Sequence, residues 1–536
     1  MELLKKTIGQ CLALRASETP RNTAIEYWDR SYTWEELHRV SDYLAVRMLT
    51  MGMEKGDHVG IWSVNTPNWI ITFLALVKIG AVPVLINTCY REQELRSVIR
   101  YADIRFLYYG DGCKSLLYEP MADQLRKEDW CQVERWVPIG RDSTGRWMSD
   151  TSFVFSEKSQ VWHKRLNRRK NQVKPQDTAA ILFTSGTTKG AKGVMLSHYN
   201  LVNSALGTLE FTQWTSGDKL LLAVPLFHCF GITSGLLTSI HVGCTIHLMK
   251  YFKTRNILEH IDQYHCTVFN GVPSMFLAMV RNPYFESYTL TSLRSGILAG
   301  SPVTEKEYEE IQKGFSGMAL LPSYGQTETS PCVTLMTRED PVGKRGTSAG
   351  RLIDHVELRI VEPETGRLLE TGQTGGVEVR GYNIMQGYYN LPEATAAVLG
   401  EDGWLRTGDL GYLDPEGYLH IAGRQGEMII RCGENIYPGE IETCIKELSF
   451  VEAVKVIGIP AEVVQEQVIA CVVPREGMAF SEEGVLEYLR PRIARYKVPA
   501  RVLRFDGLPM NASGKIQISV LKDQVMERLH NRSGSM

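Results

Sequence analysis

The sequence predicts an α/β protein: a large N-terminal domain of βα units with a small β-rich subdomain, followed by a small α+β C-terminal domain. Helical patterns alternate with short β-rich runs over residues 30–110 and again over about 178–330, which is typical of a mostly parallel sheet. From residue 340 the chain changes to short strand patterns separated by turn signals, which indicate the β-rich subdomain. From about residue 427 helix and strand patterns alternate again, over a tail that could fold separately.

The first helix and strand patterns come early in the chain. Residues 33–52 (TWEELHRVSDYLAVRMLTMG) have helical periodicity, and the runs HVGIWSV and VPVLIN that follow are typical of strands. The longest apolar run, residues 69–86, is interrupted by Lys78, Gly80 and Pro83. We therefore expect a buried helix, a glycine turn and a strand there, with a membrane span as the alternative.

The second set of βα units follows a polar interruption. Residues 164–177 (KRLNRRKNQVKPQD) are basic, so we expect a solvated linker, with a nucleic-acid contact as the alternative. Beyond it lie the candidate strands AAILFT, KLLLAVP, TIHLM, CTVFNGVP and RSGILAG. The β-rich segment that comes next contains HVELRIVEPETGRLL, GGVEVRG and GYLDPEGYLHIAG.

The composition is that of an ordinary soluble protein. A chain of 536 residues suggests roughly two to four domains. Its 59 basic and 61 acidic residues give no bias toward polyanions, so nucleic acid is not an expected partner. The 11 cysteines are scattered without a C-x-x-C pair, which fits a reducing cytosol. The N-terminus does not resemble a signal peptide, so we expect a cytoplasmic protein without a transmembrane segment, either a monomer or a homodimer.

The stretch TSGTTKGAKG, residues 184–193, is dense in hydroxyls, glycines and lysines, which suits a phosphate cradle. A P-loop requires G-x4-G-K-[ST], but Ala191 and Gly193 stand where that glycine and hydroxyl should be. A dinucleotide-binding G-x-G-x-x-G is also absent there. We expect the loop to hold the mobile phosphates of a nucleoside triphosphate; the alternative is a polar surface turn. The candidate phosphate contacts are Thr184, Ser185, Gly186, Thr187, Thr188 and Lys192.

Four further motifs follow this loop in order: SYGQTET (323–329), WLRTGDLG (404–411), IAGR (421–424) and NASGKI (511–516). Together the five motifs resemble those of the adenylate-forming superfamily of acyl-CoA synthetases, luciferases and peptide-synthetase adenylation domains. The resemblance extends over essentially the whole chain. It implies an acid-thiol ligase that converts a carboxylate and ATP to acyl-AMP and pyrophosphate, and then transfers the acyl group to coenzyme A. ATP, Mg²⁺ and coenzyme A are the implied cofactors and co-substrates.

The resemblance also implies a domain division. Residues 1–424 would form the N-terminal adenylation domain and residues 427–536 a mobile C-terminal domain that carries the catalytic lysine. The hinge would lie near residues 425–426, at Gly426, where glycine lowers the barrier to a backbone rotation. Many relatives carry aspartate or lysine at that position.

Several nucleotide contacts follow from the motifs. Tyr324 would stack on adenine, Thr327 would donate to the α-phosphate, and Glu328 would bind Mg²⁺, a hard cation that favours carboxylate and phosphate oxygens. For Glu328 the alternative is an acidic surface residue. The remaining implied contacts are Gln326, with Gly300 and Ser301 at the base.

Two charged residues are expected at the ribose. Asp409 can accept hydrogen bonds from both ribose hydroxyls, and Arg424 would approach the ribose or the α-phosphate. Each would otherwise be a capping or salt-bridge residue.

Lys515 is the implied catalytic lysine, which bridges the attacking carboxylate and the α-phosphate and offsets the repulsion between two anions. The alternative is a solvated lysine near the C-terminus. Cys432 and Gly433 would line the coenzyme A tunnel, although a glycine is usual at residue 432. The phosphate loop also departs from the family, with Lys189 and Ala191 where glycine and proline are usual.

The segment VPLFHCFG, residues 224–231, matches the P-x-F-H-x-x-G pattern of the same superfamily. The resemblance implies that His228 lies beside the carboxylate of the substrate. A buried structural histidine is the alternative. Because the residues around His228 are apolar, we expect the substrate to be a medium- or long-chain fatty acid, with an aryl or cyclic carboxylic acid as the second expectation. The implied acyl pocket consists of His228, Phe230, Gly231, Leu298 and Ala299. An acyl-AMP ligase that loads a separate carrier protein, or an inactive binding homologue, remain as alternatives.

Overall fold

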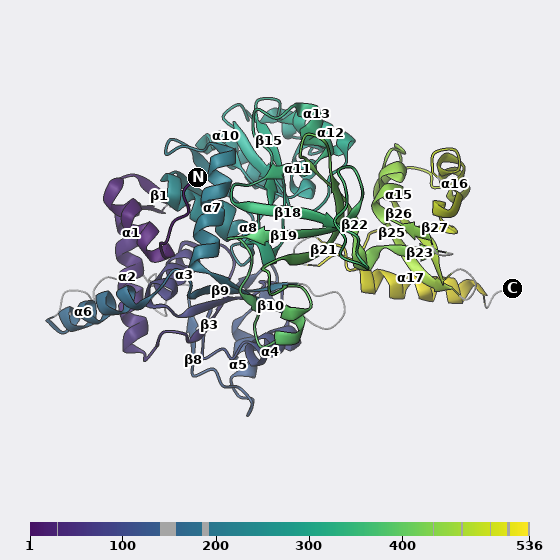
Figure 1. Ribbon diagram of the computed structural model, residues 1–536. Helices are drawn as coiled ribbons and strands as arrows, with labels where there is room; N and C mark the ends of the chain where they lie inside the picture. The colour runs from purple at the N-terminus through teal and green to yellow at the C-terminus, as the bar shows by residue number, and fades with distance from the viewer. Residues whose placement is uncertain are drawn as a thin grey trace.

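The computed structural model describes residues 1–28, 30–139, 157–184, 192–431, 434–461, 465–493, 495–511 and 515–533. Figure 1 shows a large N-terminal body and a smaller C-terminal domain beside it. Helices pack around mostly parallel sheets in the body, while the smaller domain combines its own sheet with helices. The predicted α/β fold with a large and a small domain is confirmed.

The first sheet of the body has seven strands in the order β20-β10-β9-β4-β3-β5-β8. The strands from β9 to β8 in this order are parallel, and β10 and β20 extend the sheet in antiparallel pairing. Its strands are β3 (His58–Trp62), β4 (Val82–Leu85), β5 (Phe106–Tyr109), β8 (Arg135–Pro138), β9 (Thr178–Thr184), β10 (Lys192–Ser197) and β20 (Gly387–Tyr388). The helices in this part of the chain are α2 (Trp34–Thr50), α3 (Pro67–Ile79), α4 (Glu92–Tyr101), α5 (Glu119–Leu125) and α6 (Glu157–Gln172).

The second sheet has nine strands in the order β17-β16-β15-β14-β13-β11-β12-β1-β2, parallel from β15 to β1. Its strands are β1 (Thr23–Tyr27), β2 (Arg30–Thr33), β11 (Lys219–Leu222), β12 (Thr245–Leu248), β13 (Val268–Phe269), β14 (Ser295–Leu298), β15 (Ala319–Tyr324), β16 (Thr334–Leu335) and β17 (Arg351–Leu352). The associated helices are α1 (Ile8–Glu18), α7 (His198–Thr212), α8 (Cys229–Gly231), η2 (Ile232–Leu237), α9 (Thr238–Val242), α10 (Thr254–Tyr264), α11 (Pro273–Val280), η3 (Phe285–Ser287), α12 (Glu305–Gly314), η4 (Thr327–Thr329) and α13 (Val342–Thr347).

The predicted β-rich subdomain is a four-stranded antiparallel sheet in the order β18-β19-β21-β22. Its strands are β18 (Val356–Val361), β19 (Gly375–Gly381), β21 (Leu405–Leu413) and β22 (Leu419–Arg424), with α14 (Pro392–Ala396) between β20 and β21. A short hairpin, β6 (Gly112–Cys113) and β7 (Leu116–Leu117), lies apart from the larger sheets.

The C-terminal domain has a sheet in the order β24-β23-β26-β25, with β27 paired to β26. Its strands are β23 (Ile429–Arg431), β24 (Glu434–Ile436), β25 (Val451–Ala461), β26 (Gln465–Pro474) and β27 (Arg501–Arg504). Its helices are η5 (Gln425–Glu427), α15 (Pro438–Lys446), α16 (Glu482–Leu489), η6 (Arg495–Lys497) and α17 (Ile518–Ser533).

The two parts of the chain bury separate hydrophobic cores. Val59 of β3 and Leu222 of β11 belong to one core, so the two large sheets of the N-terminal body pack together. The C-terminal domain buries Ile441 and Val485 in one cluster and Leu521 and other residues in a second, and neither contains a residue of the N-terminal body. Since most of the stability of a domain comes from such burial, the smaller domain holds itself together largely by its own contacts.

The apolar run interpreted as helix, turn and strand is confirmed. Helix α3 ends at Gly80, which has a φ of 72°, and β4 follows. Lys78 is buried in α3, but its ammonium group donates to Oδ1 of Asp42 and to Oγ of Ser41, each at 2.7 Å. These partners make its burial tolerable. In the part of the chain that the structure describes, no helix is both long and apolar enough to cross a membrane.

The basic stretch predicted to be a solvated linker is largely helical instead, since α6 continues to Gln172. Lysine and arginine favour helices, and several of them have carboxylate partners here. Arg165 and Arg169 pair with Glu54, and Lys170 donates to Asp42 at 2.6 Å. Figure 1 shows α6 projecting at the left edge of the body, far from the C-terminal domain.

Candidate active site

The motif residues Asp409 and Arg424 meet because two strands of the β-rich subdomain pair directly. In the antiparallel register of β21 and β22, Asp409 stands opposite Arg424. Nε of Arg424 lies 3.0 Å from Oδ1 of Asp409. The hydroxyl of Tyr324, at the end of β15, donates to Oδ2 of Asp409 at 2.7 Å. Three residues from three motifs thus form one polar cluster.

Asp409 is only 5% exposed. Burial raises its pKa, while Arg424 and the Tyr324 hydroxyl act in the opposite direction by favouring the ionised form. The pKa of Tyr324 is raised well above its usual value by burial and by Asp409, so this phenol stays a neutral donor. Each carboxylate oxygen has two lone pairs, and one contact per oxygen leaves acceptor capacity for ligand hydroxyls.

Glu328 lies in the short helix η4 and is 8% exposed. Tyr388 donates its hydroxyl hydrogen to Oε1 of Glu328 at 2.9 Å. Within the described residues, Glu328 forms no ion pair and its Oε2 accepts no hydrogen bond. A buried carboxylate without a cation partner is costly, so Glu328 fits a divalent cation. No cluster of three or more His, Cys, Asp or Glu side chains suited to a metal occurs in the described part of the chain; a cation at Glu328 would need oxygens from phosphates or water as well.

The ends of the phosphate loop are held together by strand pairing. Thr184, the last residue of β9, stands opposite Lys192, the first residue of β10. Nζ of Lys192 lies 4.7 Å from the centre of the Tyr388 ring. The rest of the predicted cradle lies outside the described residues: Ser185, Gly186, Thr187 and Thr188, with the unusual positions Lys189 and Ala191.

Two other predicted nucleotide contacts have distinctive local geometry. Gly300 follows β14 with a φ of 92°, and a Cβ there would lie 3.0 Å from a methyl group of Val272, so both conformation and space favour glycine. Ser301 next to it is exposed. Gln326 donates from Nε2 to the carbonyl oxygen of Thr407 at 3.3 Å, which ties the YGQTET motif to the strand that carries Asp409.

Lys515 comes from the C-terminal domain, and its backbone is fixed by Asn511. The Lys515 N–H donates to Oδ1 of Asn511 at 2.9 Å, and the Asn511 N–H donates to the Lys515 carbonyl at 2.8 Å. Desolvation lowers the pKa of Lys515, although the residue keeps solvent access. The charge of Arg424 lowers this pKa further, whereas the charges of Asp409 and Glu328 raise it. Its ammonium group therefore feels the charges of the cluster, yet it forms no ion pair within the described part of the chain.

The predicted acyl residues lie next to this cluster. Nδ1 of His228 accepts a hydrogen bond from the Phe230 N–H at 3.2 Å, so His228 caps the short helix α8. Burial, with the charge of Lys515, lowers the pKa of His228 to about 4 and keeps the imidazole neutral. At Gly231 a Cβ would collide with the carbonyl oxygen of Pro225. Phe230 and Leu298 are buried in the main core, and Ala299 is half-buried.

The predicted hinge and coenzyme A residues are only partly described. Gly426 lies in η5, between β22 and β23, where a Cβ would meet no atom within 4 Å. Neither space nor a left-handed backbone requires glycine there. Cys432 and Gly433 lie outside the described residues.

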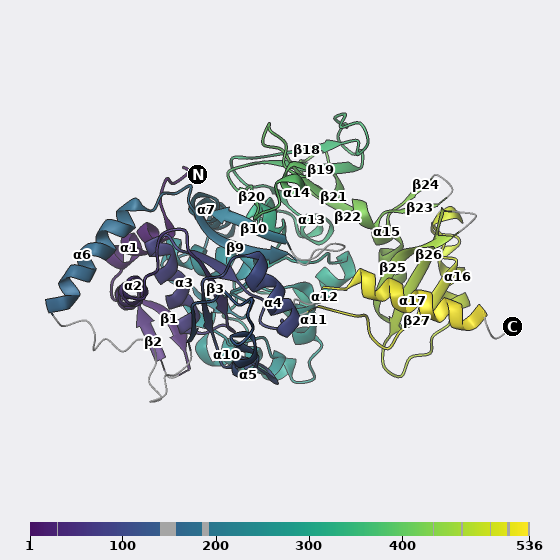
Figure 2. The same ribbon diagram turned by 90° about the horizontal axis from the view of Figure 1, so that it is seen from below.

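The two domains touch through helices α12 and α15, and Figure 2 shows α15 beside the end of β22. Nζ of Lys446, on α15, lies 3.0 and 3.1 Å from the two carboxylate oxygens of Glu307 on α12. Glu307 also caps its own helix, because Oε2 accepts from the Thr304 N–H and hydroxyl at 2.9 Å each. Lys446 lowers the pKa of Glu307, although burial acts in the opposite direction.

Comparison with known proteins agrees with the motifs. The AMP-binding enzyme family matches residues 12–389, and its C-terminal domain family matches residues 440–515. The chain belongs to the AMP-binding enzyme family.

Relatives of this AMP-binding enzyme cover nearly its whole length. The protein YngI of Bacillus subtilis, provisionally named an acyl-CoA synthetase, is 35% identical over 100% of both chains. The mitochondrial medium-chain acyl-CoA ligase of Bos taurus is 31% identical over 99% of this chain and 89% of its own. A Rhodococcus jostii ligase, which joins coenzyme A to a propanoate that bears a methyl-dioxo-octahydroindene ring system, is 34% identical over 97% of this chain and 98% of its own.

Among solved structures, ATP-bound MatB of Rhodopseudomonas palustris has a TM-score of 0.85 and 28% identity, over 97% of this chain and 99% of that chain. These findings confirm the predicted superfamily. The AMP-binding enzyme is a ligase of the acyl-CoA synthetase type, and the use of ATP and coenzyme A follows from its family.

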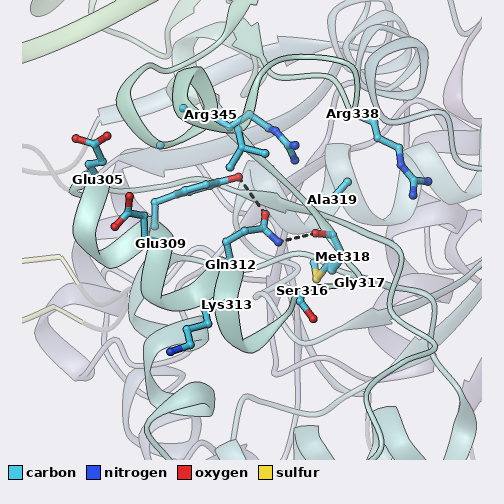
Figure 3. A pocket seen from close by; sticks show the side chains of 14 residues that line it. Glu305, Glu309, Gln312, Lys313, Ser316, Gly317, Met318, Ala319, Arg338 and Arg345 are labelled. Carbon is cyan, nitrogen blue, oxygen red and sulfur yellow. Dashed lines mark hydrogen bonds between the residues drawn. The ribbon is translucent and has the colours of Figure 1, made fainter.

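A separate cavity of about 540 Å³ lies against α12 and α13 (Figure 3). Two of its polar side chains are hydrogen-bonded within the protein: Tyr308 donates to Oε1 of Gln312 at 3.2 Å, and Gln312 donates to the Met318 carbonyl at 2.9 Å. None of the motif residues lines it. This cavity is therefore not where the motifs of the AMP-binding enzyme converge.

Sequence reasoning missed three residues that contact the predicted site or join the domains. Tyr388 contacts both Glu328 and Lys192, and Lys446 contacts Glu307 across the domain boundary. Cys229 lies 3.7 Å from Thr327, measured from Sγ to Oγ1. Tyr388 belongs to the tyrosine pair of GYYN, residues 387–390, inside the β-rich segment, where no motif pointed to it.

Proposed function

We propose that this enzyme activates a medium- or long-chain fatty acid as acyl-AMP and then transfers the acyl group to coenzyme A. The cluster of Tyr324, Asp409 and Arg424, with Lys515 brought to it from a second domain, is the observation that carries the adenylation step. The carboxylate oxygen of the acid attacks the α-phosphorus of ATP and pyrophosphate leaves. The thiol of coenzyme A then attacks the acyl carbonyl and AMP leaves.

Each motif residue has a role in this proposal. Asp409 accepts hydrogen bonds from the ribose hydroxyls with the lone pairs that Tyr324 and Arg424 leave free. Thr327 donates to the α-phosphate. Lys515 places a positive charge between the acid and the α-phosphate, where two anions must approach each other. The adenine would lie against Tyr324, with Gly300, Ser301 and Gln326 around it.

Mg²⁺ would be held by Glu328 together with phosphate oxygens and water, as this cation prefers. When bound, Mg²⁺ supplies charge neutralisation on the phosphates. The protein's own contribution is a buried carboxylate whose Oε1 is fixed by Tyr388 and whose Oε2 has no partner among the described residues. On the loop side, Thr184 and Lys192 would join Ser185, Gly186, Thr187 and Thr188 around the β- and γ-phosphates.

The two steps need different neighbours for the acyl carbon, so the C-terminal domain must move between them. We propose a division into residues 1–424 and 427–536, with rotation near residues 425–426. The open surroundings of Gly426 leave room for that rotation. Cys432 and Gly433 would contact coenzyme A after it.

The preference for a fatty acid rests on the lining of the acyl side. Phe230, Gly231, Leu298 and Ala299 are apolar, and the neutral His228 adds no charge. The name of the Bos taurus relative points to medium-chain acids. A cyclic acid is the second candidate, because the Rhodococcus jostii relative acts on a ring-fused propanoate.

The test is ATP–pyrophosphate exchange with a panel of fatty, aryl and ring-fused acids, repeated with coenzyme A and scored for acyl-CoA. We expect the largest kcat/KM with medium- or long-chain fatty acids and acyl-CoA as the product. Preference for a ring-fused acid would favour the second candidate. Exchange without thioester would indicate a separate carrier as acceptor, and no exchange with any acid would indicate an inactive homologue.

A further inference from the structure

Tyr388 is held rigidly at the edge of the first sheet. It lies in β20, opposite Val194 of β10. The residues on either side are bonded to β10, since the Gln386 N–H donates to Met195 at 2.9 Å and the Tyr389 N–H donates to Gly193 at 2.8 Å. The Tyr388 N–H itself donates to Oγ1 of Thr395 at 2.9 Å. These hydrogen bonds fix the backbone of Tyr388, and with it the position from which its side chain extends.

The hydroxyl end of Tyr388 reaches Glu328 in a buried environment. Tyr388 is 7% exposed, and its hydroxyl lies 2.9 Å from Oε1 of Glu328. The backbone adds a second contact between the segments, because the Met385 N–H donates to the Glu328 carbonyl at 2.9 Å. In the pair with Glu328 the Tyr388 hydroxyl is the donor, because a carboxylate can only accept. This hydrogen bond to a buried charge fixes one carboxylate oxygen and leaves Oε2 to face a ligand.

The ring of Tyr388 contacts a second charged group, the ammonium group of Lys192. Nζ of Lys192 lies 4.7 Å from the ring centre, within the range of a cation–π interaction. Lys192 forms no ion pair among the described residues, so its ammonium charge is not neutralised by a nearby carboxylate. The strand pairing of β10 with β20 therefore places the loop lysine on the ring whose hydroxyl holds Glu328.

We propose that Tyr388 is a positioning residue for the triphosphate end of ATP. Its hydroxyl orients Glu328 toward Mg²⁺, and its ring orients Lys192 toward the β- and γ-phosphates. One side chain thus sets the spacing of two opposite charges that come from segments more than a hundred residues apart in the sequence. The inference rests on the proposed function for the roles of Glu328 and Lys192, but it adds the residue that couples them.

The two ends of Tyr388 can be removed separately. Tyr388→Phe deletes the hydroxyl and keeps the ring, whereas Tyr388→Leu deletes both. We would measure the dissociation constant of ATP by isothermal titration calorimetry, once with MgCl₂ and once with EDTA. Pyrophosphate exchange would be followed as a function of Mg²⁺ concentration. The matched control is Tyr389→Phe, because the neighbouring tyrosine donates its hydroxyl to Asp103 at the surface, at 2.7 Å.

For Tyr388→Phe we expect ATP binding in EDTA to stay unchanged, while the gain in affinity from Mg²⁺ falls about tenfold, as for loss of a hydrogen bond to a charged group. Tyr388→Leu should also weaken binding in EDTA, by roughly threefold to tenfold, as for loss of a cation–π contact. Tyr389→Phe should match the wild type in both buffers. A Tyr388→Phe enzyme with wild-type binding in both buffers overturns the proposal, even if Tyr388→Leu proves too unstable to measure. If the wild type itself does not bind ATP, the proposed function fails instead.

Discussion

The nucleotide-facing cluster of the N-terminal domain and the Lys515 turn of the C-terminal domain are built in opposite ways. Asp409 is held by Tyr324 and Arg424, both from its own domain. Lys515 has a fixed backbone, through Asn511, but its side chain forms no ion pair within the described residues. The side chains of the first region are held by contacts within their own domain, whereas the Lys515 ammonium group stays available for the substrate. The difference suggests that binding and chemistry can be damaged separately.

The largest expected effect comes from breaking the second region. Lys515→Ala should slow acyl-AMP formation by about two to three orders of magnitude, since it removes the positive charge between two anions. Thioester formation from supplied acyl-AMP should be nearly unchanged, because the domain would have rotated by then. Pyrophosphate release and acyl-CoA formation would be measured separately. Lys522→Ala on α17 is the control, and equal loss of both steps in Lys515→Ala would contradict the assigned role.

An intermediate effect should come from weakening the first region. Asp409→Asn keeps the shape but removes the charge, so we expect KM for ATP to rise about tenfold. Unlike Lys515→Ala, Asp409→Asn should also weaken the binding of acyl-AMP in the second half-reaction, because the same ribose is bound in both half-reactions. The measurement is KM for each nucleotide in the two half-reactions. The exposed Asp402→Asn serves as control. A change confined to one half-reaction would show that Asp409 does not hold the ribose throughout.

The smallest effect should come from the contact between the domains. Lys446→Met removes the pair with Glu307 and should slow acyl-AMP formation about threefold, the scale of a partly exposed ion pair. Thioester formation from supplied acyl-AMP should hold steady or rise, since the docked arrangement is then less favoured. Stopped-flow rates of both steps would be compared with those of Lys446→Arg, which should restore the pair, and Lys313→Met on the opposite helix. Equal slowing of both steps would argue for a purely structural role.

The sequence predicted the fold class well, because periodicity and turn residues are local signals. It also selected Asp409, Arg424 and Tyr324, which the structure brings into contact. The contacts of Tyr388 were not predictable in this way, since they depend on the pairing of β10 with β20, two strands that lie far apart in the sequence. Helix α6 was missed for a related reason: its basic residues looked solvated, but carboxylates such as Glu54 come from a distant segment.

The pair between Glu307 and Lys446 also has a kinetic consequence. The Glu307 carboxylate is held by Thr304 of its own helix, a contact that does not depend on the C-terminal domain. Of the two partners, the lysine therefore loses more rotamer freedom when the pair forms. Such a receptor, prepared on one side, lowers the entropic cost of association. The Glu307–Lys446 pair would therefore raise the rate at which the C-terminal domain docks, in addition to lowering the rate at which it undocks. The Glu307–Thr304 cap of α12 would then help to determine how fast the enzyme returns to the arrangement for its first half-reaction.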